Sequence, residues 1–425
     1  MFRFIVYQSI FRNFAPELIT LIHMKKSILF LAMLLCSFAA SATTHNASSG
    51  LSWLVAGEGS PVQPGDTIIL ADGEYVEQWS YAYNKEGLVI MAAEGAKPVV
   101  KASSYMKHYA TTTFIGITFD GQDVAEYAIY SYENTSKDLR FVNCNFMNYT
   151  QYTISASSSA HVDSLIFENC VLDGSQSTLY AIYAKGTTNK IRVTGTEIKD
   201  YKEHGIKLSD AACVDALIVT NSLIHDCAYT AIQIPAASNS SSKQSCSSIE
   251  LTNSTIYNIG DNTKDYGAVD IRDNANIAST QTVLIDHVTL YNFTTNDWYG
   301  GFMIYKSANA TISNCIASNP DDIYSKYCNP FHAYAGATVS NCIYYNTNIS
   351  SESTATYTTC EKVDPMFVDA ANGDFMLYAE SPAIGMGDPC WGVKPGIQPG
   401  SGKLKAAVNA AQAGATIELG DGIYE

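Results

Sequence analysis

Charge is scarce in this chain, and basic residues are the scarcer kind. Only 16% of the 425 residues are charged, and 25 Lys and Arg stand against 41 Asp and Glu, so the formal net charge is −16. A surface of this sign repels nucleic acid and anionic membranes at long range, and we expect neither as a partner. An acidic polysaccharide held by a local basic cluster stays compatible with this balance.

Metal-binding and membrane-spanning patterns are missing as well. No Cys-x-x-Cys or Cys/His spacing indicates zinc, and no Cys/His pairing indicates a nucleophile. After the first 42 residues, no apolar run is long enough to span a membrane. The chain is 47% hydrophobic, which suits a soluble protein with a large core. We expect it to act as a monomer.

Residues 1–42 are interpreted as a targeting segment rather than as part of the fold. Met24 is followed by two lysines, an apolar run, and small residues at Ala40 and Ala42, which is the pattern of a signal peptide. We take Met24 as the initiator, with cleavage after Ala42, and residues 1–23 as lying upstream of the true start. The mature chain is predicted to be secreted, periplasmic or on the cell surface.

One pattern organises most of the sequence: segments of alternating apolar and polar residues recur about every 26 residues. Each segment is followed by Asn, Gly or His, then by a small residue and then by an apolar one. The recurring position is Gly116, Asn143, Asn169, Gly195, Asn221, Asn253, His287, Asn314 and Asn341. Alternation indicates strands, and recurrence at longer spacing indicates a repeat architecture. We expect each Asn to lie at a turn, with its amide bonding the next Asn or the backbone.

A repeat of this length predicts an all-β fold, a right-handed parallel β-helix of about ten coils. The repeat is too short for a propeller blade, whereas three short strands fill one coil and coils stack about 4.8 Å apart. Parallel crossovers make the solenoid right-handed. Two apolar columns are predicted to face the core. They are Leu139, Leu165, Ile191, Leu217, Ile249 and Val283, and Phe141, Phe167, Val193, Val219, Leu251 and Ile285.

The predicted domain boundaries follow from composition. The β-helix with its opening and closing segments is assigned to residues 43–390, and a Pro/Gly linker to 391–400. Residues 401–411 are predicted to form a short helix. Gly414–Tyr424 then repeats the string Gly65–Tyr75. We therefore expect residues 401–425 to begin a second, truncated β-helix module.

Two pairs of cysteines occupy equivalent positions on neighbouring coils. Cys144 aligns with Cys170, and Cys315 aligns with Cys342. Neighbouring coils lie within disulfide reach, and export favours oxidation. Stacked free thiols acting as small apolar side chains are an equal alternative, so the sequence leaves the redox state open.

A second strand recurs between the Asn-containing segments. Its inward column is predicted as Ile129, Ile154, Ile182, Ile206, Ile232, Val269 and Met303. Alternation places the flanking residues on the outer face. The preceding column is small: Ala128, Thr153, Ala181, Gly205, Ala231 and Ala268. The following column is Tyr130, Ser155, Tyr183, Lys207, Gln233 and Asp270, with Lys185, Arg272 and Lys306 two residues further on in their strands.

A floor of small residues flanked by aromatic and charged side chains suits an extended sugar chain. Tyrosine faces stack on sugar rings, and cations meet carboxylates or sulfates. The predicted substrate-binding set is Tyr130, Tyr183, Lys185, Gln233, Asp270 and Lys306. A polar, solvated sheet face without a ligand is the alternative.

Acidic residues in the loops that enter this face are candidates for calcium. They are Asp120, Asp123, Glu126, Asp200, Glu203, Asp226, Asp261, Asp265 and Asp297. Carboxylate oxygens are the ligands that calcium prefers, but their irregular spacing defines no site. No other cofactor is indicated.

Two strings resemble the ends of a known class of solenoid. PGDTIILADGEY, which contains Gly65–Tyr75, resembles the opening segment of secreted right-handed parallel β-helix proteins of the pectate-lyase type, particularly the chondroitinase B and alginate lyase branch. Asp364–Phe367, Asn372–Phe375 and Ser381–Gly385 resemble their closing segment. The resemblance covers roughly residues 60–390 and rests on turn and cap residues, so it implies the fold.

The resemblance also implies a chemistry, β-elimination on an acidic polysaccharide. In that reaction a base takes the proton beside a uronate carboxylate, and a cation stabilises the developing enolate. Lys207 is the predicted base, because nearby Lys185 and partial burial would lower its pKa. Arg272, about 10 Å further along the axis, is predicted to hold the carboxylate.

This chain departs from the pattern of those lyases in two respects. They place their Lys and Arg closer in sequence and carry acidic calcium ligands on the same strands, whereas here no such Glu pair is found. Asp270 also stands where a substrate anion would be repelled. A non-catalytic glycan-binding or cell-surface module is therefore the second function class.

Overall fold

The computed structural model divides the chain into two units, Met1–Thr44 and His45–Glu425. The described residues are 42–47, 60–77, 82–83, 85–102, 105–108, 110–131, 137–237, 244–260, 266–272, 280–293, 300–305, 309–321, 329–334, 336–397, 400, 402–412 and 414–419. The predicted signal peptide lies outside them except for Ala42. None of the helices within these ranges has the length and apolarity that a membrane crossing requires.

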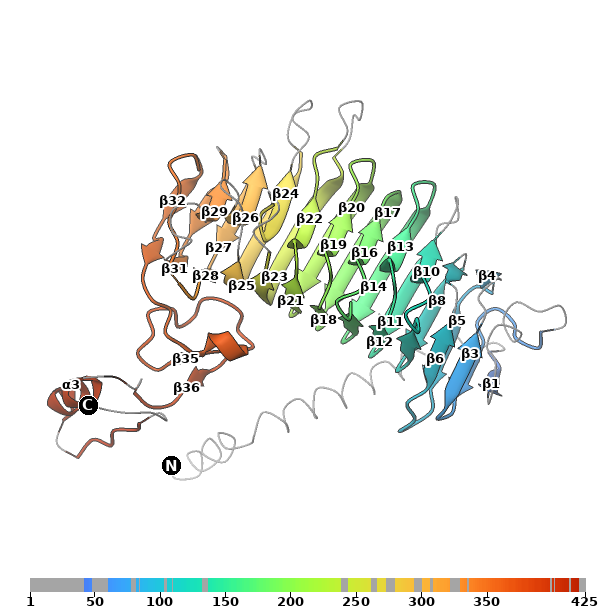
Figure 1. Ribbon diagram of the computed structural model, residues 1–425, viewed down its shortest axis with the longest axis horizontal. Helices are drawn as coiled ribbons and strands as arrows, with labels where there is room; N and C mark the ends of the chain where they lie inside the picture. Colours follow the sequence, from blue (N-terminus) through green and yellow to red (C-terminus); the bar gives the residue numbers. More distant parts are fainter. Residues whose placement is uncertain are drawn as a thin grey trace, which may run out of the picture. The chain divides into compact units, whose positions relative to one another are not determined.

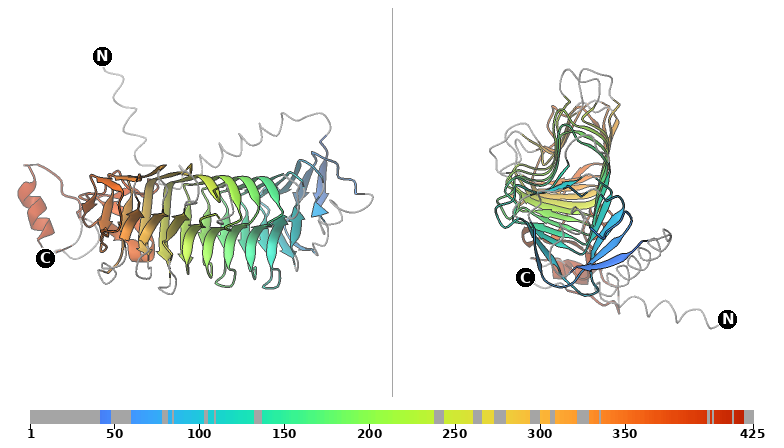
Figure 2. Two further views of the ribbon diagram at one scale, coloured as in Figure 1. Left: turned by 90° about the horizontal axis from the view of Figure 1, so that it is seen from above. Right: turned by 90° about the vertical axis from the view of Figure 1, so that its right-hand side faces the viewer.

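The second unit is a right-handed parallel β-helix, as the repeat predicted. Strands from successive coils pair in parallel and lie side by side along the solenoid (Figure 1). Figure 2 shows the same strands from above, stacked one coil after another. One coil contributes short strands to two large sheets, because turns interrupt each strand after a few residues.

The smaller of the two large sheets has ten strands and carries the candidate site. Its strands are β4 (Ala82–Tyr83), β7 (Met106–His108), β10 (Tyr127–Ser131), β13 (Tyr152–Ala156), β16 (Tyr180–Ala184), β19 (His204–Leu208), β22 (Thr230–Ile234), β24 (Val269–Arg272), β26 (Gly300–Tyr305) and β29 (Asn329–Ala333). We call it the ten-stranded sheet.

The longer sheet has 23 strands and contains the Asn-bearing segments. Its strands are β1 (Thr44–Ala47), β2 (Thr67–Leu70), β3 (Glu74–Glu77), β5 (Leu88–Ala92), β6 (Val99–Ala102), β8 (Thr112–Ile115), β9 (Thr118–Asp120), β11 (Asp138–Val142), β12 (Asn145–Met147), β14 (His161–Glu168), β15 (Val171–Asp173), β17 (Thr187–Thr194), β18 (Glu197–Lys199), β20 (Cys213–Thr220), β21 (Leu223–Cys227), β23 (Cys246–Ile259), β25 (Thr282–Phe293), β27 (Asn309–Ser313), β28 (Ile316–Ser318), β30 (Thr338–Ser340), β31 (Ile343–Tyr345), β32 (Thr356–Thr358) and β33 (Glu361–Lys362).

Both predicted core columns are confirmed by the strand register of the longer sheet. In the first column each residue pairs with the next along the solenoid: Leu139, Leu165, Ile191, Leu217, Ile249 and Val283. The second column pairs in the same way: Phe141, Phe167, Val193, Val219, Leu251 and Ile285. All of these side chains are buried. The rings of Phe141 and Phe167 stack with centroids 5.2 Å apart, and Phe114 continues the stack at 5.3 Å from Phe141. Equivalent apolar side chains therefore face one continuous core.

The recurring Asn, Gly and His position is set by the backbone. Every member of that column has a positive φ, from 48° at Asn253 to 70° at Gly116. Asn and Gly adopt this left-handed conformation at the lowest cost. At one end of the solenoid the expected ladder of amides forms, because Asn341 Nδ2 donates to Asn314 Oδ1 at 2.6 Å and Asn314 Nδ2 donates to Asp286 Oδ1 at 2.7 Å.

Elsewhere in this column the side chains of several asparagines face solvent. Asn143, Asn169 and Asn221 are exposed. Their backbone still bonds to the next coil, since the N–H of Asn169 donates to the Thr194 carbonyl of β17 at 2.9 Å. The requirement for left-handed backbone, and not burial of an amide, thus explains most of the repeated asparagines.

This explanation predicts different effects for two substitutions at one position. Asn169→Ala should lower the free energy of unfolding by about 1 kcal/mol, because alanine is disfavoured at positive φ, whereas Asn169→Gly should change it little. Asn348→Ala, at an exposed residue outside the column, is the matched control. Chemical denaturation measures all three, and equal losses for Ala and Gly at position 169 would contradict the backbone explanation.

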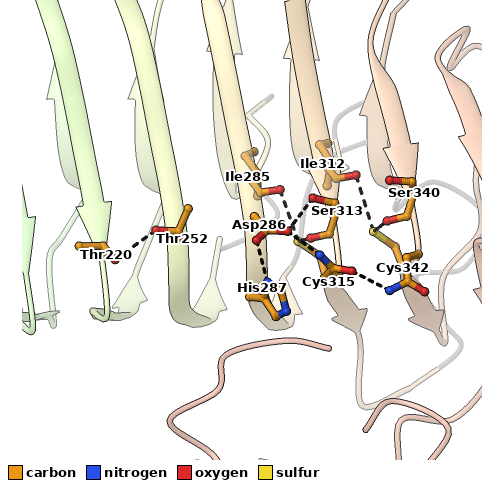
Figure 3. A network of polar contacts seen from close by, with 12 residues as sticks. Thr220, Thr252, Ile285, Asp286, His287, Ile312, Ser313, Cys315, Ser340 and Cys342 are labelled. Atoms are coloured by element: carbon orange, nitrogen blue, oxygen red, sulfur yellow. Dashed lines mark hydrogen bonds and ion pairs between the residues drawn. The ribbon is translucent and has the colours of Figure 1, made fainter. Parts of the chain in front are cut away.

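In the described part of the chain, the four aligned cysteines are free thiols, and all of them are buried: Cys144, Cys170, Cys315 and Cys342. Cys315 Sγ donates to the Ser313 carbonyl at 3.0 Å, and Cys342 Sγ to the Ser340 carbonyl at 3.2 Å (Figure 3). In the same turn region Ser313 Oγ donates to Asp286 Oδ1 at 2.6 Å. The thiols therefore act here as small core side chains with local backbone partners.

The predicted closing segment packs on the side of the last coils. It contains β34 (Phe367–Asp369), the short 3₁₀ turn η2 (Ala370–Asn372), β35 (Asp374–Tyr378) and β36 (Val393–Lys394). Thr255 Oγ1 of β23 donates to Asp388 Oδ2 at 2.7 Å, and Trp391 Nε1 donates to Thr255 Oγ1 at 2.7 Å. Buried hydrogen bonds of this kind tie the segment to the longer sheet.

The predicted helix near the C-terminal end is present as α3 (Lys403–Ala410), and none of its residues is buried. The side chains of Val408 and Leu419 are 54% and 47% exposed. One isolated bridge joins Ile397 to Leu419. Residues 401–425 as the start of a second module stay a prediction.

Deletion of residues 401–425 is expected to leave the melting temperature nearly unchanged. The segment buries few apolar side chains among its described residues, so little hydrophobic stabilisation is lost with it. Thermal unfolding followed by circular dichroism measures the effect. A fall of many degrees would show instead that the segment caps the solenoid.

Candidate functional site

The ten-stranded sheet aligns one residue per strand on its face away from the core. From β7 to β29 this column is Lys107, Tyr130, Ser155, Tyr183, Lys207, Gln233, Asp270, Met303 and His332. We call it the outer column. It contains five of the predicted site residues in the predicted order, on strands that lie next to one another in Figure 1.

The predicted floor of small residues is wrong, because that column faces the core. A Cβ added to Gly205 would lie 3.3 Å from Ile224 Cγ2 and 3.4 Å from Ile198 Cγ2, which are core side chains. Thr153 Oγ1 likewise hydrogen-bonds the buried Tyr201 hydroxyl at 2.7 Å. In these strands the small residue and the apolar residue after it are both buried, as Ala181 and Ile182 are, so two consecutive residues face the core and simple alternation fails there.

One member of the predicted inward column is also misplaced. Met303 pairs with Asp270, and Phe302 pairs with Val269, so Met303 belongs to the outer column. The sequence alignment therefore placed this strand one residue out of register. Tyr305 consequently pairs with Arg272. Lys306, predicted to contact the substrate, lies outside the described residues.

Sequence reasoning missed the first residue of each strand. Tyr127, Tyr152, Tyr180 and His204 pair in register, and successive ring centroids are 5.5, 4.9 and 5.1 Å apart. Tyr105 continues this line at 5.4 Å from Tyr127. We call the set Tyr105, Tyr127, Tyr152, Tyr180 and His204 the aromatic strip. Its signal was present in the sequence, because three of the aligned strands begin with Tyr.

Tyr183 and Lys185 lie together beside the aromatic strip. The ring of Tyr183 is 4.9 Å from that of Tyr152, and Lys185 Nζ lies 4.6 Å from the Tyr183 centroid and 5.4 Å from the Tyr152 centroid. Partial burial lowers the pKa of Lys185. The pair presents aromatic carbon and positive charge together, which is the combination expected for an acidic sugar.

Lys207 is held at the centre of the site by neighbours on its own strand and the next. Its Nζ donates to Gln233 Oε1 and lies 3.5 Å from His204 Nε2. It is also 5.9 Å from the ring centroids of both Tyr180 and Tyr266. Burial lowers the pKa of Lys207, Arg272 lowers it further, and the charges of Glu203 and Asp270 act against this change.

His204 beside Lys207 is an uncharged partner. It is 2% exposed, and burial together with the charge of Lys207 lowers its pKa to about 2. His204 Nδ1 hydrogen-bonds Thr230 Oγ1 at 2.8 Å. An Nδ1-protonated tautomer leaves Nε2 as an acceptor toward Lys207. Lys207 therefore has two acceptors, Gln233 Oε1 and His204 Nε2.

Asp270 and Arg272 form a bidentate ion pair. Arg272 Nε donates to Asp270 Oδ1 at 2.9 Å and Nη2 donates to Oδ2 at 2.8 Å. The Asp270 side chain is 0% exposed and that of Arg272 is 30% exposed. Burial raises the pKa of Asp270, although Arg272 and Lys207 both act to lower it. The pair therefore explains an acidic residue in the outer column, since its carboxylate is turned to Arg272.

The described acidic residues do not fit a calcium site. No three His, Cys, Asp or Glu side chains within the described part of the chain converge as metal ligands. Glu203 instead accepts a hydrogen bond from the Tyr180 hydroxyl at 2.9 Å, and Asp120 accepts one from Asn148 Nδ2 at 2.9 Å. Asp261, Asp265 and Asp297 lie outside the described residues.

Comparison with protein families gives one partial match. The profile of a family described as "Domain of unknown function (DUF5123)" matches residues 283–391. These residues run from β25 through Trp391 and include most of the closing segment. A search among curated proteins finds no match.

Solved structures of several solenoid enzymes are similar to this chain at low identity. Pectate lyase Pel9A is 15% identical with a TM-score of 0.39, over 82% of this chain and 92% of that one. The PL6 family alginate lyase AlyGC is 12% identical with a TM-score of 0.40, over 87% and 63%. A variant catalytic domain of GH87 α-1,3-glucanase, in complex with nigerose, is 16% identical with a TM-score of 0.33, over 76% and 63%.

Proposed function

We propose that this protein is an exported polysaccharide lyase that cleaves a uronate-containing glycan by β-elimination. The observation that carries the proposal is the setting of Lys207. Its amine has a pKa lowered by burial and is held by Gln233 and by neutral His204. It stands in the outer column between an aromatic strip on one side and Asp270–Arg272 on the other.

The two acceptors around Lys207 orient its lone pair. A neutral amine has two N–H bonds, and Gln233 Oε1 and His204 Nε2 can accept both. The lone pair then points away from these two acceptors, where a bound substrate would meet it. A general base needs a free lone pair and a pKa near the working pH, and burial of Lys207 acts in that direction.

The proposed reaction moves one proton and one leaving group. Lys207 Nζ takes the proton from C5 of a uronate, whose carboxylate spreads the developing negative charge. The electron pair of that C–H bond forms the C4–C5 double bond, and the bond from C4 to the glycosidic oxygen breaks. The oxygen leaves with its electron pair and takes a proton from water. The product is an unsaturated uronate at the new chain end.

The site has more cations than anions, since Lys185, Lys207 and Arg272 stand against Glu203 and Asp270, and this balance supports an acidic substrate. The ten-stranded sheet carries Lys207 on β19 and Arg272 on β24, and Lys185 directly follows β16. The chain as a whole has a net charge of −16. Arg272 gives two donor groups to Asp270, and its charge still reaches Lys207. The guanidinium, two strands away from the base, would add to the positive potential that stabilises the enolate on the uronate.

A non-catalytic glycan-binding module is the second candidate, and the Asp270–Arg272 pair favours it. An arginine that holds a buried aspartate in bidentate geometry has less capacity to hold a substrate carboxylate as well. In this alternative Lys185 and the tyrosines bind the glycan, and no bond is broken. The aromatic strip is equally compatible with a lyase and with a binding module.

One experiment separates the candidates. The full chain is incubated with a panel of acidic polysaccharides, and unsaturated uronate is followed by its ultraviolet absorbance while binding is measured in parallel at low and high salt. A lyase gives new absorbance. A binding module gives salt-sensitive binding without absorbance, since partly exposed charges are screened. No acidic glycan bound at low salt would leave the sheet face as solvated surface and overturn the proposal.

A further inference from the structure

A pocket lies at one end of the aromatic strip, apart from Lys207. It has a volume of about 340 Å³ and is lined by Tyr105, Lys107, Glu126, Tyr127 and Tyr130. The rings of Tyr127 and Tyr130 stack at 5.2 Å, and Tyr105 contacts both by its edge at 5.4 Å. Three aromatic rings form the apolar part of its wall, while Lys107, Glu126 and the tyrosine hydroxyls make most of its accessible lining polar, and its volume is within the range of small-ligand sites.

The pocket and Lys207 share the outer column. Tyr130 pairs with Ser155, Ser155 with Tyr183, and Tyr183 with Lys207. Three strand spacings separate Tyr130 from Lys207, about 14 Å along the axis. The aromatic strip runs beside this path without interruption from Tyr105 to His204. A single sugar does not reach both places, whereas an extended oligosaccharide does.

The charges of the two places differ. The pocket has one cation, Lys107, and one anion, Glu126, so it offers no net attraction to a carboxylate. Around Lys207 the three cations Lys185, Lys207 and Arg272 stand against the two anions Glu203 and Asp270, so the balance there is positive. A charged donor and a charged acceptor in the same pocket as tyrosine faces suit hydroxyl groups and the apolar face of a neutral sugar ring.

We propose that this pocket is a second carbohydrate subsite, which binds an uncharged sugar ring of the same glycan whose uronate faces Lys207. The preferred ligand is then a mixed polysaccharide, with neutral sugars a few units away from the acidic one. This inference depends on the proposed function only in placing a uronate at Lys207. The neutral subsite depends on the pocket alone.

The test compares binding of three size-matched sets of oligosaccharides: neutral fragments, fragments of uronate homopolymers, and fragments that contain both kinds of sugar. Tyr105→Ala removes one wall of the pocket from a residue that precedes β7 and belongs to no strand. Tyr105→Leu keeps the bulk without the ring and serves if the alanine variant unfolds. Tyr345→Ala, on β31 of the longer sheet, is the matched control, and Lys185→Ala reports on the acidic unit.

We expect mixed fragments to bind wild type most tightly and to lose roughly tenfold in affinity with Tyr105→Ala, the loss of one aromatic contact. Neutral fragments should show the same loss, no salt dependence and no response to Lys185→Ala. Tyr345→Ala should change nothing.

The outcomes distinguish the two proposals. Neutral binding that depends on Tyr105, without any binding of uronate fragments, would support the pocket and overturn the proposed function. Uronate binding that depends on Lys185 but not on Tyr105, with no binding of neutral sugars, would overturn the pocket alone. Loss of uronate homopolymer binding in Tyr105→Ala, again without neutral binding, would show that the pocket takes an acidic unit and would also overturn this inference.

Discussion

Lys207→Ala is expected to abolish cleavage while glycan binding falls only moderately. Removal of a general base lowers the catalytic rate by about 10²–10⁴-fold, because no other group then takes the proton from the uronate. Binding persists, since Tyr130, Tyr183 and Arg272 remain in place. The measurement is the rate of unsaturated uronate formation beside an equilibrium binding curve for the same glycan.

Lys185→Ala is the matched control for this prediction. It removes an equal charge, which contacts the rings of Tyr183 and Tyr152 rather than Gln233 and His204. Its loss should weaken binding and raise KM with little change in kcat, because it attracts the substrate and moves no proton. If Lys207→Ala still forms unsaturated product at the wild-type rate, Lys207 is not the base.

The pH dependence follows from the same group. Lys207 acts as a base only when its amine is neutral, so kcat/KM should rise with pH and level off above its pKa in the free enzyme. Burial lowers that pKa from its ordinary value, which brings the rise closer to neutral pH than for an exposed lysine. A rate that falls as the pH rises would require a protonated group in its place.

The repeat made the core predictable, because stacked coils give equivalent positions the same surroundings. Leu139 and its partners were assigned inward from sequence alone, and the register confirms each pairing. The Asn column was located equally well, but its physical reason was misjudged. Positive φ at Asn169 and Gly195 alike shows that the turn selects these residues through the backbone.

The site was less predictable, because it depends on where alternation fails. Ala181 and Ile182 are both buried while the rings of Tyr180 and Tyr183 contact each other at 5.0 Å. A pattern of period two does not predict two consecutive inward residues. The same limit hid His204, which contacts Lys207 although the two residues are three apart in one strand.

The largest effect on stability is expected when Asp270 loses its ion-pair partner. Arg272→Leu should lower the free energy of unfolding by about 3 kcal/mol at neutral pH, because it leaves a buried carboxylate without its partner. Asp270 is 0% exposed, and both of its oxygens accept hydrogen bonds from Arg272. Urea unfolding of the full chain measures the loss.

The double variant Asp270→Asn with Arg272→Leu tests whether the buried charge is the cause. It removes both charges, so it should recover much of the stability that Arg272→Leu loses. Recovery of none would show that packing of the arginine side chain, and not the aspartate charge, carries the effect.

Acidification should act on the single variant in a defined direction. Burial already raises the pKa of Asp270 in the folded protein, and Arg272 and Lys207 are the groups that hold it down. Without Arg272 the pKa rises further, and only Lys207 still opposes the rise. A carboxyl with a raised folded-state pKa destabilises the fold when it is ionised, and this penalty disappears as the pH falls below that pKa. The deficit of Arg272→Leu relative to the double variant should therefore shrink as the pH falls from neutral toward the ordinary pKa of an aspartate, and a deficit that grows on acidification would contradict a buried charge.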